Sequence, residues 1–435
     1  MFKSWIKKGL EKGLQELEIY AVESKSLKLS LYQGKLDQHV KSDVLGVKIK
    51  GIYYDKLTSV AFENLEDANI DFMLEQLIEN AKTINAKEPA IIYEGSESYP
   101  TVKENNYDFD LIPITHKIDL IKELESRILE NEYVKQVQTT IYVESATKTT
   151  LINSKGLNLT RKNSLAYAYA VGVFQKEDDI QTAYKMKLAK TFEDFDIKAL
   201  ADETISIGVK KLGGQTIPSG SYPTVFSNEM FAEILEAFSG IFVGEAAYRN
   251  LTSLKDKVSQ QIFSSKVNII DDPLSEKAYF QNSFDDEGVA CKTKDIIKNG
   301  VFKGFIHNLK TAKIFNQEPT GNGFGGGTSM SNCYLEPQDT SFDEMIKTIK
   351  NGVYITDLVG THAGIQTVSG EFSLQASGFK IENGLITTPV KMIVISGNFF
   401  KMMNDIHTIA NDLEFQLSGF GSPSIYINQL MIGGK

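Results

Sequence analysis

The feature that most constrains the fold is an apolar stripe between residues 229 and 249. Ser227 is the predicted N-cap of a helix there, and the pair Ser239 and Gly240 predicts a bend. Side chains three and four residues apart lie on one side of a helix, so we expect one buried face. We therefore expect this helix to organise the second half of the chain. The stripe consists of Met230, Phe231, Ile234, Leu235, Phe238, Ile241 and Phe242.

Alternation of apolar and polar residues predicts strands over 18–64 and 133–190. Helical stripes predict helices at 2–17, 116–132 and 197–212. The predicted fold class is α+β, with N-terminal α/β sandwich-type units containing antiparallel sheets and a C-terminal β-rich domain with a few helices. Whether the first two units form one domain is left open. The predicted parts are an N-terminal α+β unit (1–85), a connection (86–113), a middle α+β unit (114–214) and the C-terminal domain (215–435).

Shorter patterns divide the C-terminal domain. Ser341 and Glu344 form a predicted capping box that begins a helix ending at Gly352. Strands are predicted at 222–226, 266–270, 288–293, 301–309, 331–335, 353–359, 371–381, 390–395 and 424–432.

Composition excludes several classes of protein. The net charge of −10 disfavours direct nucleic-acid binding, which depends on Lys and Arg at phosphates. No run approaches 18 apolar residues and no signal-peptide pattern begins the chain, so we expect neither a membrane span nor secretion. Lysines on the 2–17 helix suggest a membrane surface, but interspersed glutamates favour a packing helix. The only cysteines, Cys291 and Cys333, fit a reducing cytoplasm.

Small and aromatic residues alternate within the predicted strand at 166–170. Ala166, Ala168 and Ala170 share one face, and Tyr167 and Tyr169 share the other. The tyrosine face is expected to pack against a helix. Peptide or sugar binding by this face is the alternative.

Five glycines cluster between residues 321 and 327. The cluster lacks G-K-[ST] and precedes a predicted strand, which disfavours a phosphate loop. Glycines allow close backbone approach, either to another strand or to an extended peptide. Peptide binding by strand addition is the functional alternative, because exposed N–H and C=O groups can pair with any sequence.

An ordered series of motifs resembles the TldD/PmbA family, once called modulators of DNA gyrase. The resemblance spans most of the chain, although no single motif is decisive. Candidate substrate-binding residues within it are Thr320, Gly321, Asn322, Gly323, His362 and Gly364. The motifs are N-S-K-G-L (153–157), T-G-N-G (320–323), G-T-H-A-G-I-Q-T-V-S-G-E-F (360–372), I-E-N-G-L-I-T-T-P-V-K (381–391), I-S-G-N (395–398), G-F-G-S-P (419–423) and the closing G-G.

This family contains two kinds of subunit. The TldD-like kind carries H-E-x-x-x-H and a later cysteine that complete a zinc site, and the PmbA-like kind, also called TldE, lacks them. Glu236 falls on the family's glutamate, while Leu235 and Gly240 replace the two histidines. The stretch 411–423, where the cysteine loop would lie, holds no cysteine. The resemblance therefore implies a PmbA-like subunit with no metal, no cofactor and no catalytic residue.

The implied role is that of a cytoplasmic partner for a TldD-like zinc protease that cleaves peptides or unfolded segments. A homodimer is the alternative assembly. This chain would supply part of the substrate chamber. Convergence of His307, His362 and Glu236 on a replacement metal is disfavoured by their spacing. The competing functions are a hydrolase that uses residues other than zinc ligands and a non-enzymatic binding or regulatory protein, for example a topoisomerase modulator.

Overall fold

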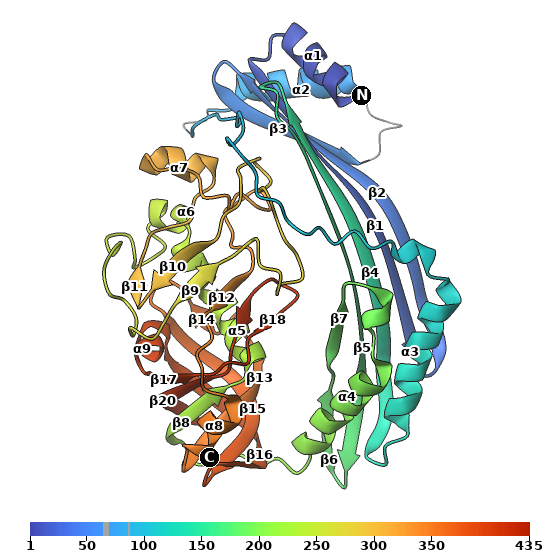
Figure 1. Cartoon of the computed structure of the whole chain (residues 1–435), viewed down its shortest axis with the longest axis vertical. Helices are drawn as coiled ribbons and strands as arrows, with labels where there is room; N and C mark the ends of the chain where they lie inside the picture. Colours follow the sequence, from blue (N-terminus) through green and yellow to red (C-terminus); the bar gives the residue numbers. More distant parts are fainter. Residues whose placement is uncertain (64–68, 86–87) are drawn as a thin grey trace.

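The computed structural model describes residues 1–63, 69–85 and 88–435. It consists of a long curved sheet with its helices and a second, β-rich body (Figure 1). The predicted α+β class, with antiparallel N-terminal sheets and a β-rich C-terminal part, is confirmed. Residues 64–68 of the predicted N-terminal unit and 86–87 of the predicted connection lie outside the described residues. No described helix is long and apolar enough to cross a membrane.

The first sheet joins strands from both early parts of the chain. Its order is β3-β2-β1-β4-β5-β6, and β7 pairs with another part of β5. Because β1 pairs with β4 along most of its length, the two parts share one sheet. The strands are β1 (Glu16–Tyr32), β2 (Lys35–Tyr53), β3 (Lys56–Glu63), β4 (Val134–Asn153), β5 (Asn158–Lys176), β6 (Asp179–Ala183) and β7 (Met186–Ala189).

Helices cover the first sheet near its two ends. α1 (Phe2–Glu11) and α2 (Ile70–Thr83) pack at one end, and α3 (Ile114–Leu129) and α4 (Ile197–Lys211) at the other (Figure 1). The prediction of one helix over 2–17 is wrong beyond Glu11. Gly13 takes a φ of 97°, which ends the helix, and Leu17 is buried from strand β1 instead.

The predicted packing of the tyrosine face against a helix is wrong. Ala166, Ala168 and Ala170 are the residues that join the core beneath the helices, together with Leu124 of α3 and Leu200 of α4. Small side chains on this face let the helices approach the sheet closely. The tyrosines project from the opposite face, where Tyr167 and Tyr169 stack with ring centroids 6.4 Å apart.

The connection after residue 88 crosses to the C-terminal body. It contains a short helix, η1 (Phe109–Leu111). The Tyr99 hydroxyl donates to the Gly288 carbonyl at 2.8 Å, and the Lys103 N–H donates to Oε1 of Gln281 at 2.9 Å. These hydrogen bonds attach the connection to the C-terminal body.

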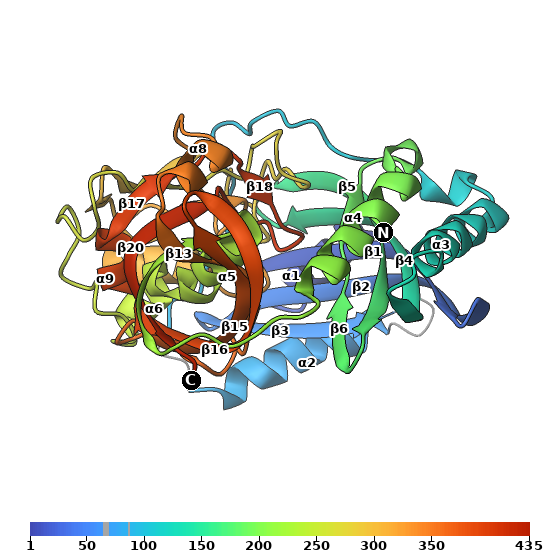
Figure 2. The same ribbon diagram turned by 90° about the horizontal axis from the view of Figure 1, so that it is seen from below.

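The C-terminal body contains a closed sheet and an open sheet. In the closed sheet the order is β13-β8-β20-β16-β15, and an additional β13–β15 pairing completes the ring (Figure 2). The open sheet has the order β11-β10-β9-β12-β19-β18. The strands are β8 (Gly220–Phe226), β9 (Ile269–Asp271), β10 (Lys294–Lys298), β11 (Val301–Phe302), β12 (Cys333–Leu335), β13 (Asn351–Val359), β14 (Ile365–Gln366), β15 (Glu371–Glu382), β16 (Leu385–Asn398), β17 (Ile406–Ile409), β18 (Glu414–Phe415), β19 (Gly421–Ser422) and β20 (Ile425–Gly433).

Helix α5 (Asn228–Phe238) carries the apolar stripe into the core between these sheets. Ser227 caps it, accepting from the Met230 N–H at 3.3 Å, as predicted. The helix does not continue to residue 249: a 3₁₀ turn, η3 (Ser239–Phe242), and α6 (Gly244–Tyr248) follow at the predicted bend.

Other predicted boundaries in this body differ from the structure. Residues 288–293 form no regular strand, and only Val301–Phe302 of the 301–309 run is a strand. Their apolar side chains, such as Val289 and Ile306, are buried from loops. The helix with the Ser341–Glu344 capping box ends at Lys347 rather than Gly352. The remaining helices are η2 (Phe192–Asp194), α7 (Leu309–Phe315), α8 (Phe342–Lys347) and α9 (Phe399–Asn404).

Candidate functional site

Two cavities lie between the first sheet and the C-terminal body. The larger, about 760 Å³, is lined by β6, β7, α4, α5 and the loop that follows β18. The smaller, about 430 Å³, is lined by β4, β5 and C-terminal loops. Both are lined by Leu417 and Ser418, so the loop after β18 separates them. We call them the acidic groove and the neutral pocket.

Carboxylates outnumber cations in the acidic groove. Its lining contains three lysines, of which Lys211 pairs with Asp357 at 2.7 Å. Lys185 contacts Glu229 directly, and its Nζ lies 3.9 Å from Oε1 of Glu414. Burial raises the pKa of Glu414, which the Lys185 charge opposes. The carboxylates are Glu203, Glu229, Glu233, Glu236, Asp357 and Glu414.

The two residues predicted to stand at the family's histidine positions have no side-chain metal ligand. Leu235 is completely buried in the core, and Gly240 lies exposed in η3. Glu236, between them in sequence, is exposed and lines the acidic groove. Zinc in a catalytic site takes about three nitrogen, sulfur or carboxylate ligands. These positions supply one carboxylate.

The loop facing this helix supplies no cysteine. Residues 411–423 hold β18 and β19, and the Gln416 N–H donates to the Phe420 carbonyl at 2.8 Å to close the turn. His307 is buried against Thr311, and burial lowers its pKa to about 4. In the ranges that the structure describes, no three or more His, Cys, Asp or Glu side chains are grouped to hold a metal ion. The residues present therefore do not fit a catalytic zinc.

Both cysteine side chains lie in the core of the C-terminal body. Cys291 is 3% exposed and Cys333 is completely buried. Burial raises the pKa of both thiols above the usual value. A nucleophilic cysteine needs accessible thiolate, so this placement disfavours a cysteine hydrolase.

Residues 320–323 form a buried network behind the neutral pocket. Asn322 is fully buried and donates to Oδ2 of Asp271 at 2.7 Å, and it accepts from the Thr320 hydroxyl at 2.7 Å. The Gly323 N–H donates to Oδ2 of Asp285 at 2.7 Å, and burial raises the pKa of Asp285 to about 7. A Cβ at Gly321 would lie 2.6 Å from the Ala290 carbonyl oxygen. The predicted close backbone approach is confirmed at Gly321 but not at the other four glycines, since a Cβ at Gly323 would meet the Glu287 side chain and the last three have open space around them. Substrate binding by 320–323 stays a prediction.

His362 and Gly364 lie elsewhere, in the loop after β13. The Thr361 hydroxyl donates to Oε1 of Glu233 at 2.8 Å, which brings this loop to α5 beside the acidic groove. His362 is exposed. A Cβ at Gly364 would lie 2.2 Å from the Ser373 carbonyl oxygen. The structure thus separates the predicted binding residues into two groups, one near each cavity.

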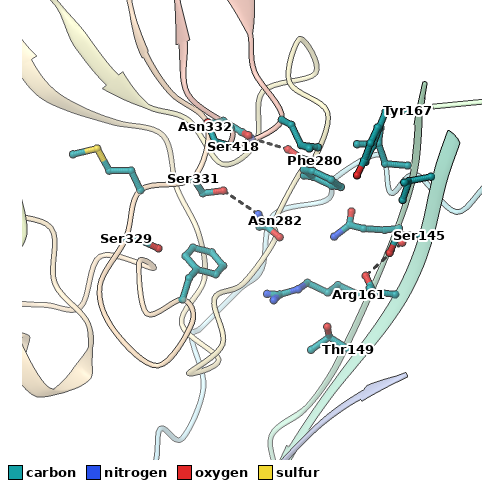
Figure 3. Close-up of a pocket in the computed structure, with 18 residues that line it drawn as sticks. Ser145, Thr149, Arg161, Tyr167, Phe280, Asn282, Ser329, Ser331, Asn332 and Ser418 are labelled. Carbon is teal, nitrogen blue, oxygen red and sulfur yellow. Dashed lines mark hydrogen bonds between the residues drawn. The ribbon is translucent and has the colours of Figure 1, made fainter. Parts of the chain in front are cut away.

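The neutral pocket was not predicted from the sequence. Figure 3 shows Ser145, Thr149 and Arg161 of the first sheet facing Asn282 and Ser331 from C-terminal loops. Arg161 donates to the Phe284 carbonyl at 2.6 Å and forms an ion pair with Asp286. Its guanidinium also lies over the rings of Phe284 and Phe324. The alternation at 166–170 was a partial signal, since Tyr167 lines this pocket.

Two strands at sheet edges, β7 and β18, contribute residues to the acidic groove. Among the described strands, β7 pairs only with β5 and β18 only with β19. Tyr184, Lys185 and Met186 line the groove at the start of β7, and Glu414 to Ser418 line it from β18 onward. Unpaired strand edges present N–H and C=O groups to an extended chain. The arrangement can therefore hold a peptide by its backbone.

Comparisons with known proteins are consistent across the chain. The family models described as PmbA/TldA metallopeptidase central domain and C-terminal domain match residues 107–212 and 219–434. A curated relative, the metalloprotease PmbA homolog of Buchnera aphidicola, is 27% identical over 65% of this chain, and the match spans 62% of that protein.

Two solved structures match over their whole length. A Thermotoga maritima protein described as a modulator of a DNA gyrase is 30% identical, covers 100% of both chains and superposes with a TM-score of 0.93. TldE from Thermococcus kodakarensis superposes with a TM-score of 0.90 over 100% of both chains at 21% identity, which shows a shared fold.

Proposed function

The chain belongs to the PmbA/TldD metallopeptidase family, and we propose that it is the PmbA-like, or TldE-like, subunit of a TldD-type metallopeptidase complex. The complex acts on peptides or unfolded segments. This chain carries no zinc of its own and supplies part of the chamber in which the substrate lies. The zinc and the hydrolytic chemistry belong to the partner subunit.

One observation carries the proposal. At the two histidine positions of the catalytic kind, this chain has a leucine buried in the core and a glycine, so neither position offers an electron pair to a metal. Glu236 remains in the groove, but a carboxylate with no metal to polarise a water beside it has little hydrolytic power.

In this proposal the acidic groove binds the substrate and takes no part in its hydrolysis. Its strand edges on β7 and β18 hold a substrate extended through backbone hydrogen bonds, which makes binding tolerant of sequence. In this proposal the 360–364 loop, with His362 and Gly364, closes the groove beside α5. Residues 320–323 support the wall of the neutral pocket. We also propose that the C-terminal domain begins near residue 215 and that the protein is cytoplasmic.

Purification of the chain alone and with its genomic H-E-x-x-x-H partner tests the assignment. We expect no stoichiometric zinc and no peptidase activity from this chain alone, a complex with the partner, and greater activity from the mixture than from either component. Metal analysis, size-exclusion chromatography and a fluorogenic peptide assay provide the readouts.

Two outcomes would favour the competing functions. Peptidase activity of the lone chain that a chelator, thiol reagent or serine reagent abolishes would indicate a hydrolase with other residues. A complex with a topoisomerase, and none with an H-E-x-x-x-H protein, would indicate a regulatory protein.

A further inference from the structure

We propose that the neutral pocket is a subsite for an uncharged aromatic side chain of the peptide that lies in the cleft. This inference rests on the proposed peptide-binding function and adds a substrate preference to it. It concerns a cavity distinct from the groove beside α5.

The walls of the pocket suit a flat apolar group. Three partly exposed rings line it, those of Tyr167, Phe280 and Phe324, with Met330 and Leu417 between the C-terminal loops. Aromatic side chains prefer offset or edge-to-face contacts with other rings, and methionine sulfur packs well against ring edges. The volume of about 430 Å³ holds a side chain together with its adjoining backbone.

The pocket offers no uncompensated charge to a charged side chain. Among its described lining residues, only Arg161 carries a charge at neutral pH. Its guanidinium donates to the Phe284 carbonyl and pairs with Asp286, whose carboxylate compensates its charge. Asp286 in turn accepts from the Tyr20 hydroxyl at 2.8 Å and from the Gly325 N–H at 2.9 Å. A lysine that entered would lose hydration and meet no carboxylate among the described lining residues, and a glutamate would meet a guanidinium that Asp286 already compensates.

Polar atoms at the rim accommodate tyrosine and tryptophan as well as phenylalanine. Asn282 donates to the Ser331 hydroxyl at 2.9 Å (Figure 3). Within the described residues, its carbonyl oxygen and the Tyr167 hydroxyl have no hydrogen-bond partner in the protein. A phenol or indole N–H can donate to either atom.

The pocket and the acidic groove lie on either side of one loop. Leu417 and Ser418 line both cavities from the loop after β18. Successive side chains of an extended peptide point to opposite sides. A peptide held along the strand edges can therefore pass this loop and direct one side chain into the pocket.

Fluorescence anisotropy with labelled host peptides tests the subsite on the purified full chain. The peptides share a threonine- and serine-rich sequence and differ at one central residue, which is Phe, Tyr, Ala, Lys or Glu. We expect the Phe and Tyr peptides to bind about five- to ten-fold more tightly than the Ala, Lys and Glu peptides.

The matched variants are Tyr167→Ala and Tyr169→Ala. The two tyrosines share a strand and a face, but only Tyr167 lines the pocket. Tyr167→Ala should lower affinity for the Phe and Tyr peptides to about that for the Ala peptide, whereas Tyr169→Ala should preserve the preference. Asn282→Asp should place a carboxylate in the pocket and shift the preference to the Lys peptide. Thermal unfolding of each variant checks that it is folded.

The outcomes separate this inference from the proposed function. Binding of all peptides with equal affinity, or a preference that survives both Tyr167→Ala and Asn282→Asp, overturns the subsite and leaves the peptide-binding function intact. Failure of every peptide to bind overturns the peptide-binding role of this chain and the subsite with it.

Discussion

The neutral pocket and the acidic groove share a loop but hold charge differently. In the pocket, Arg161 and Asp286 pair with each other and with the surrounding protein. In the groove, six carboxylates face three lysines, and Glu236 lies exposed with no cation in contact among the described residues. The two neighbouring cavities therefore differ in kind, because charged groups line one and apolar and neutral polar groups dominate the other.

The elements that carry each lining explain the difference. The groove displays the exposed face of α5, where polar residues oppose the buried apolar stripe. The pocket displays two long strands whose lining residues, apart from the paired Arg161, are hydroxyls, an amide and apolar or aromatic groups, opposite loops with phenylalanines. An amphipathic helix gives one wall a charged surface, while the sheet face gives the other a neutral one.

The largest expected effect is a loss of unfolding free energy when a buried carboxylate next to the neutral pocket is removed. The Asp271 carboxylate is fully buried and accepts from Lys294 Nζ at 2.8 Å and from the Ser331 N–H of the pocket wall at 2.7 Å. Asp271→Ala should cost about 3–5 kcal/mol of unfolding free energy, because Lys294 loses its partner in a desolvated site.

Asp357→Ala is the matched change at the groove. Its side chain is 34% exposed in its pair with Lys211, so we expect a loss of only about 1 kcal/mol or less. Urea unfolding of both variants makes the comparison. Equal losses of unfolding free energy would contradict the expectation that the buried ion pair at the pocket wall stabilises the fold more than the exposed pair at the groove.

Charge reversal in the groove should separate the two cavities by ligand. Glu236→Lys should weaken a lysine-rich peptide about ten-fold, because like charges then meet where opposite charges met. Affinity for the uncharged Phe peptide should change little. Glu130→Lys is the control, since Glu130 is exposed at the end of α3 and lines neither cavity. Loss of both peptides in Glu236→Lys would mean that the groove and pocket do not act separately.

Salt should affect the two cavities unequally. Raising ionic strength from about 0.1 M to about 1 M shortens the Debye length from about 10 Å to about 3 Å. Fluorescence anisotropy should show that the lysine-rich peptide binds several-fold more weakly at high salt, while affinity for the Phe peptide stays the same or increases. A parallel decline for both peptides would argue against an uncharged pocket.

The smallest expected effect is a pH dependence from Glu414. Burial raises its pKa above the usual value, so this carboxylate gains a proton at a higher pH than an ordinary glutamate as pH falls. Protonation removes one negative charge from the groove, and affinity for the lysine-rich peptide should fall about two-fold through that transition. Glu414→Gln should remove this part of the pH profile. A wild-type profile in the variant would assign the transition to another group.

Local patterns predicted the elements that short-range rules govern. Period-two alternation located the long strands of the first sheet, and the capping residues Ser227 and Ser341 located helix starts. The predicted ends of helices and strands were wrong where buried apolar residues continue beyond the end of the element. Leu14 and Leu17 fit a helical stripe by spacing, yet the turn at Gly13 places them beyond the helix.

The candidate site was only partly accessible from the sequence. Leu235, Glu236 and Gly240 were found because the family's ligands lie close together on one helix. The neutral pocket combines Arg161 of β5 with Asn282 and Ser418, residues more than 100 positions apart. No spacing rule connects such residues, because their proximity depends on how the first sheet faces the C-terminal loops.

The sequence by itself determined the family and the α+β composition, since each depends on residue identity or local period. It also predicts that Leu235 and Gly240 stand at the two histidine positions. Only the tertiary structure decided which face of β5 the helices cover. Alternation groups the alanines and the tyrosines on opposite faces, but it does not say which face lies inward. Packing of α3 and α4 against the alanines left Tyr167 facing the cleft, where it lines the neutral pocket.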